Sequence, residues 1–129
     1  MAGPRQKTVL VVDDDQDLLS LVALVLEGEG FRVQTAVDGR AGLEAVEREM
    51  PDLILLDIRM PGMDGCEFTR HFRARHDYRT PIVVLTASME RDRWVTDTGA
   101  VGWIDKPFDL DTLVQIVRRY TRGQATPSR

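Results

Sequence analysis

The stretch LILLD at residues 53–57 is a run of four apolar residues that ends in a carboxylate. Two similar runs, VLVV at residues 9–12 and IVVL at residues 82–85, are also followed at once by polar residues. None of the three alternates apolar with polar side chains, which indicates strands buried on both faces, as in a parallel sheet covered by helices. Weaker patterns at residues 31–36 and 103–105 predict two further strands nearer the edges of the sheet.

Helical patterns occupy most of the segments between these strands. Apolar residues at helical spacing predict helices over residues 18–26, 39–50, 67–75 and 110–120. The segment between Ser88 and Thr98 is shorter and more polar, and we expect it to be a poor helix. Regular alternation of strand and helix predicts one α/β domain, a doubly wound parallel sheet with right-handed crossovers.

Aspartates mark the expected helix starts. Asp15 or Asp17 is the candidate N-cap of the first helix, which ends at the glycines at positions 28 and 30. Asp109 or Asp111 is the candidate N-cap of the last helix. We interpret the Asp-Gly pair at residues 64–65 as a turn.

Composition limits the class of protein. The chain has 129 residues, enough for one core, and we expect a domain over residues 8–121 with flexible ends at 1–7 and 122–129. A net charge of −4 argues against direct nucleic-acid binding through bulk charge. The absence of long apolar runs argues against membrane insertion. The single cysteine, Cys66, and a polar start without a secretory signal lead us to expect a cytoplasmic location.

Polar residues stand just beyond the carboxyl ends of the predicted strands. They are Asp13, Asp14, Asp57, Thr86 and Lys106. In open α/β sheets ligands bind at this edge, so the fold gathers these side chains. Crowded carboxylates without His or Cys suit a hard cation such as Mg²⁺ rather than zinc. A lysine and a threonine beside them form a cradle for a phosphoryl group, and a carboxylate is itself a possible nucleophile.

Four segments carry a resemblance to a known family. They are VVDDD at 11–15, LLDIRMPGMDG at 55–65, VLTA at 84–87 and DKPF at 105–108. Together they resemble the receiver domains of two-component response regulators, and the likeness extends over about residues 8–120. The resemblance implies a flavodoxin-like (β/α)5 fold with strand order 2-1-3-4-5.

The resemblance also implies a role for each site residue. Asp57 is the expected phosphoacceptor. Asp14, Asp57 and the backbone carbonyl of Arg59 would bind Mg²⁺ directly, and Asp13 would bind it mainly through water. Lys106 would pair with the phosphoryl oxygens, or with Asp57 before phosphorylation.

The same family likeness describes a switch. Thr86 would move toward the phosphoryl group, and Trp103 stands at the aromatic switch position. The peptide bond between Lys106 and Pro107 would be cis. A histidine kinase or phosphotransfer protein would donate the phosphoryl group, and a target protein would bind the fourth helix, fifth strand and fifth helix. The protein would be a monomer or weak dimer, and it would catalyse only its own phosphorylation and slow autodephosphorylation.

Three departures from the family pattern qualify these expectations. The spacing from Thr86 to Lys106 is a residue or two short, so we expect the fourth helix to be shortened, reshaped or mobile. Trp103 is larger than the usual Tyr or Phe, and a shorter fourth helix is one source of space for it. Arg59 is placed to reach over the phosphoryl group, and Ser88 offers nothing to orient a water, which predicts slow to moderate self-dephosphorylation.

Other functions remain as alternatives. The main competitor is a receiver-like interaction module that works without phosphorylation. A Mg²⁺-dependent phosphatase is disfavoured because Arg59 stands where a general acid is needed and no insertion could form a substrate cap. A flavin carrier is disfavoured because the aspartates at 13–15 would repel a phosphate. No helix-turn-helix pattern follows Tyr120, and the sequence leaves open a stand-alone regulator, a phosphate shuttle or a receiver excised from a larger protein.

Overall fold

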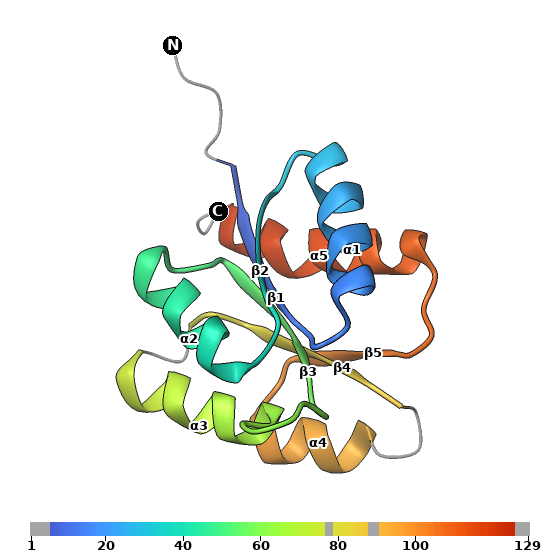
Figure 1. The fold of residues 1–129 in the computed structure, drawn as a ribbon. Coiled ribbons are helices and arrows are strands. Elements are labelled where there is room, and N and C mark those ends of the chain that lie inside the picture. Colours follow the sequence, from blue (N-terminus) through green and yellow to red (C-terminus); the bar gives the residue numbers. More distant parts are fainter. Residues whose placement is uncertain (1–5, 77–78, 88–90, 126–129) are drawn as a thin grey trace.

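The computed structural model describes residues 6–76, 79–87 and 91–125, in which five strands alternate with five helices (Figure 1). The elements in chain order are β1 Thr8–Val12, α1 Gln16–Gly28, β2 Arg32–Ala36, α2 Gly39–Arg48, β3 Leu53–Asp57, α3 Gly65–Arg75, β4 Ile82–Thr86, α4 Arg91–Thr98, β5 Gly102–Asp105 and α5 Leu110–Ala125. All strand pairs are parallel, and the sheet order is β2-β1-β3-β4-β5. The predicted architecture and strand order are confirmed.

Two layers of helices cover the sheet (Figure 1). Helices α1 and α5 lie on one face, and α2, α3 and α4 lie on the other. Successive strand residues point to opposite faces, so Val9 packs with the α1–α5 layer while Leu10 packs with the α2–α4 layer. Every residue of β1, β3 and β4 is buried, which explains why these three runs are apolar without alternation.

The register of the strands aligns their carboxyl ends. Val12 pairs with Leu56, and Asp57 pairs with Leu85. Thr86 pairs with Asp105 at the other side of β4. The polar residues that end or follow these strands therefore meet at one edge of the sheet.

Aspartate caps begin the helices on both faces. The Asp15 carboxylate accepts a hydrogen bond from the Leu18 N–H, which decides between the two candidate caps of α1. Asp64 caps α3 and exchanges hydrogen bonds with Glu67 in a capping box. Our interpretation of residues 64–65 as a turn was therefore wrong, and α3 begins two residues earlier than predicted.

The segment that we expected to be a poor helix contains α4, Arg91–Thr98. That expectation was wrong for these residues, whereas residues 88–90 lie outside the described part of the chain. The helix is held by its few apolar residues, since Trp94 and Val95 pack against the α2–α4 side of the core. Neighbouring residues complete the C-terminal end of α4. The Thr98 hydroxyl donates a hydrogen bond to the Trp94 carbonyl at 2.7 Å, and Gly99 ends the helix in a left-handed conformation with φ +69°.

The final helix continues to Ala125, beyond Tyr120, where the apolar face ends. The predicted domain boundary at residue 121 therefore falls inside α5, and Arg122 is helical rather than part of a flexible tail. Within the described ranges, no helix is both long enough and apolar enough to cross a membrane.

Candidate functional site

Three carboxylates form a cluster at the carboxyl edge of the sheet. Asp13 follows β1 and is fully buried, Asp57 ends β3 and is 6% exposed, and Asp14 is exposed. One oxygen from each lies within 4.8 Å of the other two. They line a pocket of about 340 Å³ whose wall also includes Arg59, Thr86 and the Lys106 side chain. The five polar residues singled out by the sequence therefore meet in one pocket.

Both carboxylate oxygens of Asp13 are occupied by hydrogen bonds within the protein. Its Oδ1 accepts from the Asp15 backbone N–H at 2.9 Å, and its Oδ2 accepts from Lys106 Nζ at 2.8 Å. The Asp13 backbone N–H donates to the Ala36 carbonyl on β2 at 3.0 Å. Asp13 is thus a fixed, buried anion rather than a mobile ligand.

Lys106 lies between two of the carboxylates. Its Nζ is 2.8 Å from Asp13 Oδ2 and 3.4 Å from Asp57 Oδ1. Burial alone would lower the pKa of this ammonium, but the hydrogen bond to Asp13 and the charges of Asp57 and Asp13 raise its pKa above the ordinary lysine value. The Lys106 backbone N–H donates to the Thr86 carbonyl, and the bond to Pro107 is cis. The expected pairing with Asp57 is present, although Asp13 is the closer partner.

Burial is the main reason why the pKa of Asp57 is raised, from 3.8 to about 6. The negative charge of Asp13 adds to this effect, and that of Asp14 adds a little more, whereas the Lys106 ammonium opposes it. The Asp57 carboxylate is therefore mostly ionised at neutral pH but more basic than an ordinary aspartate. An anion of this kind is a better nucleophile toward phosphorus than a fully solvated carboxylate.

The donor set of the pocket fits a hard divalent cation. The pocket has a net negative charge, because the Lys106 ammonium and the Arg59 guanidinium offset only part of the charge of its four carboxylates, those of Asp13, Asp14, Asp15 and Asp57. All of these side-chain donors are oxygens, and hard oxygen ligands favour Mg²⁺ or Ca²⁺ over zinc and copper. Arg59, two residues beyond Asp57, is exposed and lines the same pocket.

The two expected switch residues lie in different surroundings. Thr86 ends β4 at the wall of the acidic pocket, is 5% exposed and donates its hydroxyl to the Ala87 carbonyl at 3.1 Å. Trp103 on β5 is 41% exposed and lines a separate hollow of about 300 Å³ with Phe108 and Ile116. The structure therefore places Thr86 at the acidic pocket and Trp103 outside it.

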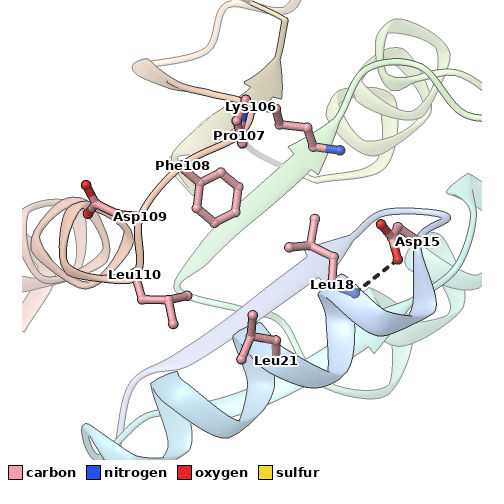
Figure 2. Close-up of a pocket in the computed structure, with 8 residues that line it drawn as sticks. All are labelled: Asp15, Leu18, Leu21, Lys106, Pro107, Phe108, Asp109 and Leu110. Atoms are coloured by element: carbon pink, nitrogen blue, oxygen red, sulfur yellow. Dashed lines mark hydrogen bonds between the residues drawn. The ribbon is translucent and has the colours of Figure 1, made fainter.

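A larger apolar pocket, which sequence reasoning missed, adjoins the acidic one. Figure 2 shows its lining: Asp15, the N-cap of α1, Leu18 and Leu21 from α1, residues 106–109 from the loop after β5, and Leu110 at the start of α5. Its volume is about 630 Å³. Asp15 and Lys106 line both pockets. The sequence signal was the apolar pair Phe108 and Leu110 directly after the Lys-Pro pair.

Comparisons with known proteins agree with this geometry. The profile of the response regulator receiver domain matches residues 9–118. The DNA-binding response regulator MtrA of Mycolicibacterium smegmatis is 42% identical over 127 residues, an alignment that covers 96% of this chain and 54% of that protein. The DNA-binding transcriptional regulator NtrC of Escherichia coli is 38% identical over 113 residues, which cover 86% of this chain and 24% of NtrC. This chain therefore spans about half the length of MtrA and a quarter of NtrC.

Solved structures show the same similarity. The chemotaxis response regulator CheY4 of Vibrio cholerae superposes with a TM-score of 0.83 at 36% identity, covering 90% of this chain and 99% of CheY4. The receiver domain of NtrX from Brucella abortus superposes with a TM-score of 0.80 at 32% identity, covering 88% of this chain and 98% of that domain.

Proposed function

Because this chain belongs to the response regulator receiver domain family, we propose that it is a phosphorylation-controlled signalling switch. A phosphohistidine on a histidine kinase or phosphotransfer protein donates a phosphoryl group to Asp57. The observation that carries this proposal is the position of Asp57, a buried carboxylate between Lys106 and two further aspartates. Its raised pKa, about 6, supports a role as nucleophile at neutral pH.

The transfer needs little covalent chemistry from the protein. An Asp57 carboxylate oxygen attacks the phosphorus, the bond between phosphorus and the donor's imidazole nitrogen breaks, and the imidazole keeps that electron pair. Most of the catalytic effect then comes from positioning and charge. The Lys106 ammonium is placed to neutralise phosphoryl oxygens, and the Thr86 hydroxyl is placed to turn from Ala87 toward them.

We propose that Asp14, Asp57 and the Arg59 backbone carbonyl hold Mg²⁺ directly, and that Asp13 acts through water. When bound, the ion would neutralise charge on the phosphoryl oxygens. The indirect role of Asp13 is supported by its two oxygens, which already accept hydrogen bonds from Asp15 and Lys106.

The output of the switch is a change in protein binding. We propose that a downstream target binds α4, β5 and α5, where the exposed Trp103 ring reports the phosphorylation state. Within this proposal the domain is a cytoplasmic monomer or weak dimer that contacts no nucleic acid itself. Beyond accepting and slowly losing its own phosphoryl group, it catalyses no reaction.

The proposal is tested by incubating the protein with acetyl phosphate and Mg²⁺ and measuring its intact mass. We expect a gain of one phosphoryl group that disappears in Asp57→Asn and when EDTA replaces Mg²⁺. A protein that folds, binds Mg²⁺ and gains no mass with either acetyl phosphate or a phosphorylated kinase would contradict the proposal. That result would favour an interaction module that works without phosphorylation.

A further inference from the structure

Asp15 is not one of the proposed metal ligands, but it joins the start of α1 to the acidic pocket. We propose that Asp15 is a positioning residue for this pocket. The Asp15 side chain caps α1, and the cap keeps the Asp15 backbone N–H hydrogen-bonded to the Asp13 carboxylate. In this way Asp15 sets the affinity of the pocket for Mg²⁺ without contact with the ion. The effect on affinity rests on the proposed Mg²⁺ site, whereas the hydrogen bonds that carry it belong to the metal-free protein.

Three interactions fix the backbone of Asp15. Its carboxylate accepts a hydrogen bond from the Leu18 N–H at 3.1 Å, the dashed contact in Figure 2. Its carbonyl accepts from the Leu19 N–H at 3.0 Å, the first hydrogen bond of the helix. Its own N–H then points back along the chain to Asp13 Oδ1 at 2.9 Å. The cap therefore determines where this N–H is aimed.

The contact matters because Asp13 is fully buried. With Lys106 on Oδ2, the Asp15 N–H is the partner that the structure gives Oδ1. A buried carboxylate oxygen without a donor is costly, so loss of this N–H would favour rotation of the carboxylate. Rotation would change the spacing of the Asp13, Asp14 and Asp57 oxygens, which now lie within 4.8 Å of one another.

A simpler role for Asp15 would be its charge, since its side chain lines the acidic pocket. Two substitutions separate the roles. Asparagine caps helices as well as aspartate does, so Asp15→Asn keeps the cap and removes the charge. Alanine cannot cap, so Asp15→Ala removes both. Asp38 provides the matched control, because it caps α2 through the Ala41 N–H at 2.8 Å and lies outside the acidic pocket.

The test is calorimetric titration of Mg²⁺ into the wild type, Asp15→Ala, Asp15→Asn and Asp38→Ala. We expect Asp15→Ala to weaken Mg²⁺ binding about tenfold, the lower end of the range for residues that orient metal ligands. Asp15→Asn should stay within about twofold of the wild type, as expected for a cap of equal strength. Asp38→Ala should lower the unfolding temperature like Asp15→Ala and leave Mg²⁺ affinity unchanged.

Three outcomes of the titration would overturn the proposal. They are equal affinities in the wild type and Asp15→Ala, a loss in Asp15→Asn as large as that in Asp15→Ala, and an equal loss in Asp38→Ala. A second readout needs no metal: the amide of residue 15 should be less protected from hydrogen exchange in Asp15→Ala than in Asp15→Asn. Equal protection there would overturn the positioning itself, whereas failure of the wild type to bind Mg²⁺ would overturn the metal site and the effect on affinity.

Discussion

The Lys106 ammonium donates a 2.8 Å hydrogen bond to the fully buried carboxylate of Asp13, although 93 positions separate the two residues in the sequence. The same ammonium is 3.4 Å from Asp57. One cation therefore compensates two buried anions that end neighbouring strands. This arrangement offsets the repulsion between the carboxylates of the acidic pocket. The stability of the fold therefore depends on the residues of the site.

Removal of Lys106 should be strongly destabilising. In Lys106→Met, Asp13 and Asp57 keep their charges and lose their shared partner, so we expect the free energy of unfolding in EDTA at pH 7 to fall by about 2–4 kcal/mol. Urea unfolding measures this change. The control is a double-mutant cycle with Asp13→Asn, in which the double variant should lose less than the sum of the single variants. Strict additivity would show that the two side chains are not coupled.

Asp57 should make the metal-free protein less stable as the pH rises. Its pKa is about 6 in the folded protein against an ordinary value of 3.8, so the folded state binds the proton more tightly than the unfolded state. The resulting stability is fully present below pH 3.8 and is lost as the pH rises through 6. Asp57→Asn cannot ionise and should therefore be more stable than the wild type at pH 7.5.

The expected difference between these two proteins is about 1–2 kcal/mol at pH 7.5. One pKa unit corresponds to about 1.4 kcal/mol, and water at the mouth of the pocket screens part of the interaction. Urea unfolding in EDTA at several pH values measures the difference, which should shrink toward zero near pH 4. A difference that stays constant with pH would assign the effect to packing of the amide rather than to ionisation.

The sequence was most informative where burial leaves no choice of residue. The runs at 53–57 and 82–86 are buried along their whole length, so their composition alone indicated central parallel strands. The edge at which Asp13, Asp57 and Lys106 meet followed from the fold class, because parallel strands end at a common edge. Helix α4 was expected only as a poor or altered helix, because the polarity of residues 91–98 hides a helix that is held by Trp94 and Val95.

Contacts between side chains were beyond the reach of the sequence. The residue types predicted an acidic cluster with one lysine, but they did not indicate which carboxylate Lys106 contacts most closely. That choice depends on the depth of each side chain and on the Asp15 N–H, which fixes the orientation of Asp13. The apolar pocket in Figure 2 forms only when α1 packs beside the loop after β5, two segments that are far apart in the chain.

Arg59 should slow loss of the phosphoryl group. It is exposed at the rim of the acidic pocket, two residues beyond Asp57, within reach of a charge-assisted contact to a phosphoryl oxygen. We expect Arg59→Ala to shorten the half-life of the phosphorylated protein about threefold, a modest effect because the side chain is solvated. The half-life of phosphorylated Arg59→Lys, which keeps the charge, should lie between those of the wild type and Arg59→Ala. Unchanged decay of the mass-detected phosphoprotein would exclude Arg59 from this role.

Trp103 should report events in the acidic pocket from outside it. The side chain is 41% exposed on β5 and stands three residues before Lys106, so movement of that strand end should change its fluorescence. In a Trp94→Phe background, which leaves Trp103 as the single tryptophan, we expect a saturable change with Mg²⁺ and a further change with beryllofluoride. Asp57→Asn should abolish the second change. If phosphorylation leaves the emission unaltered, Asp57 accepts the phosphoryl group without movement of Trp103. A different residue on α4 or α5 would then have to change the target-binding surface.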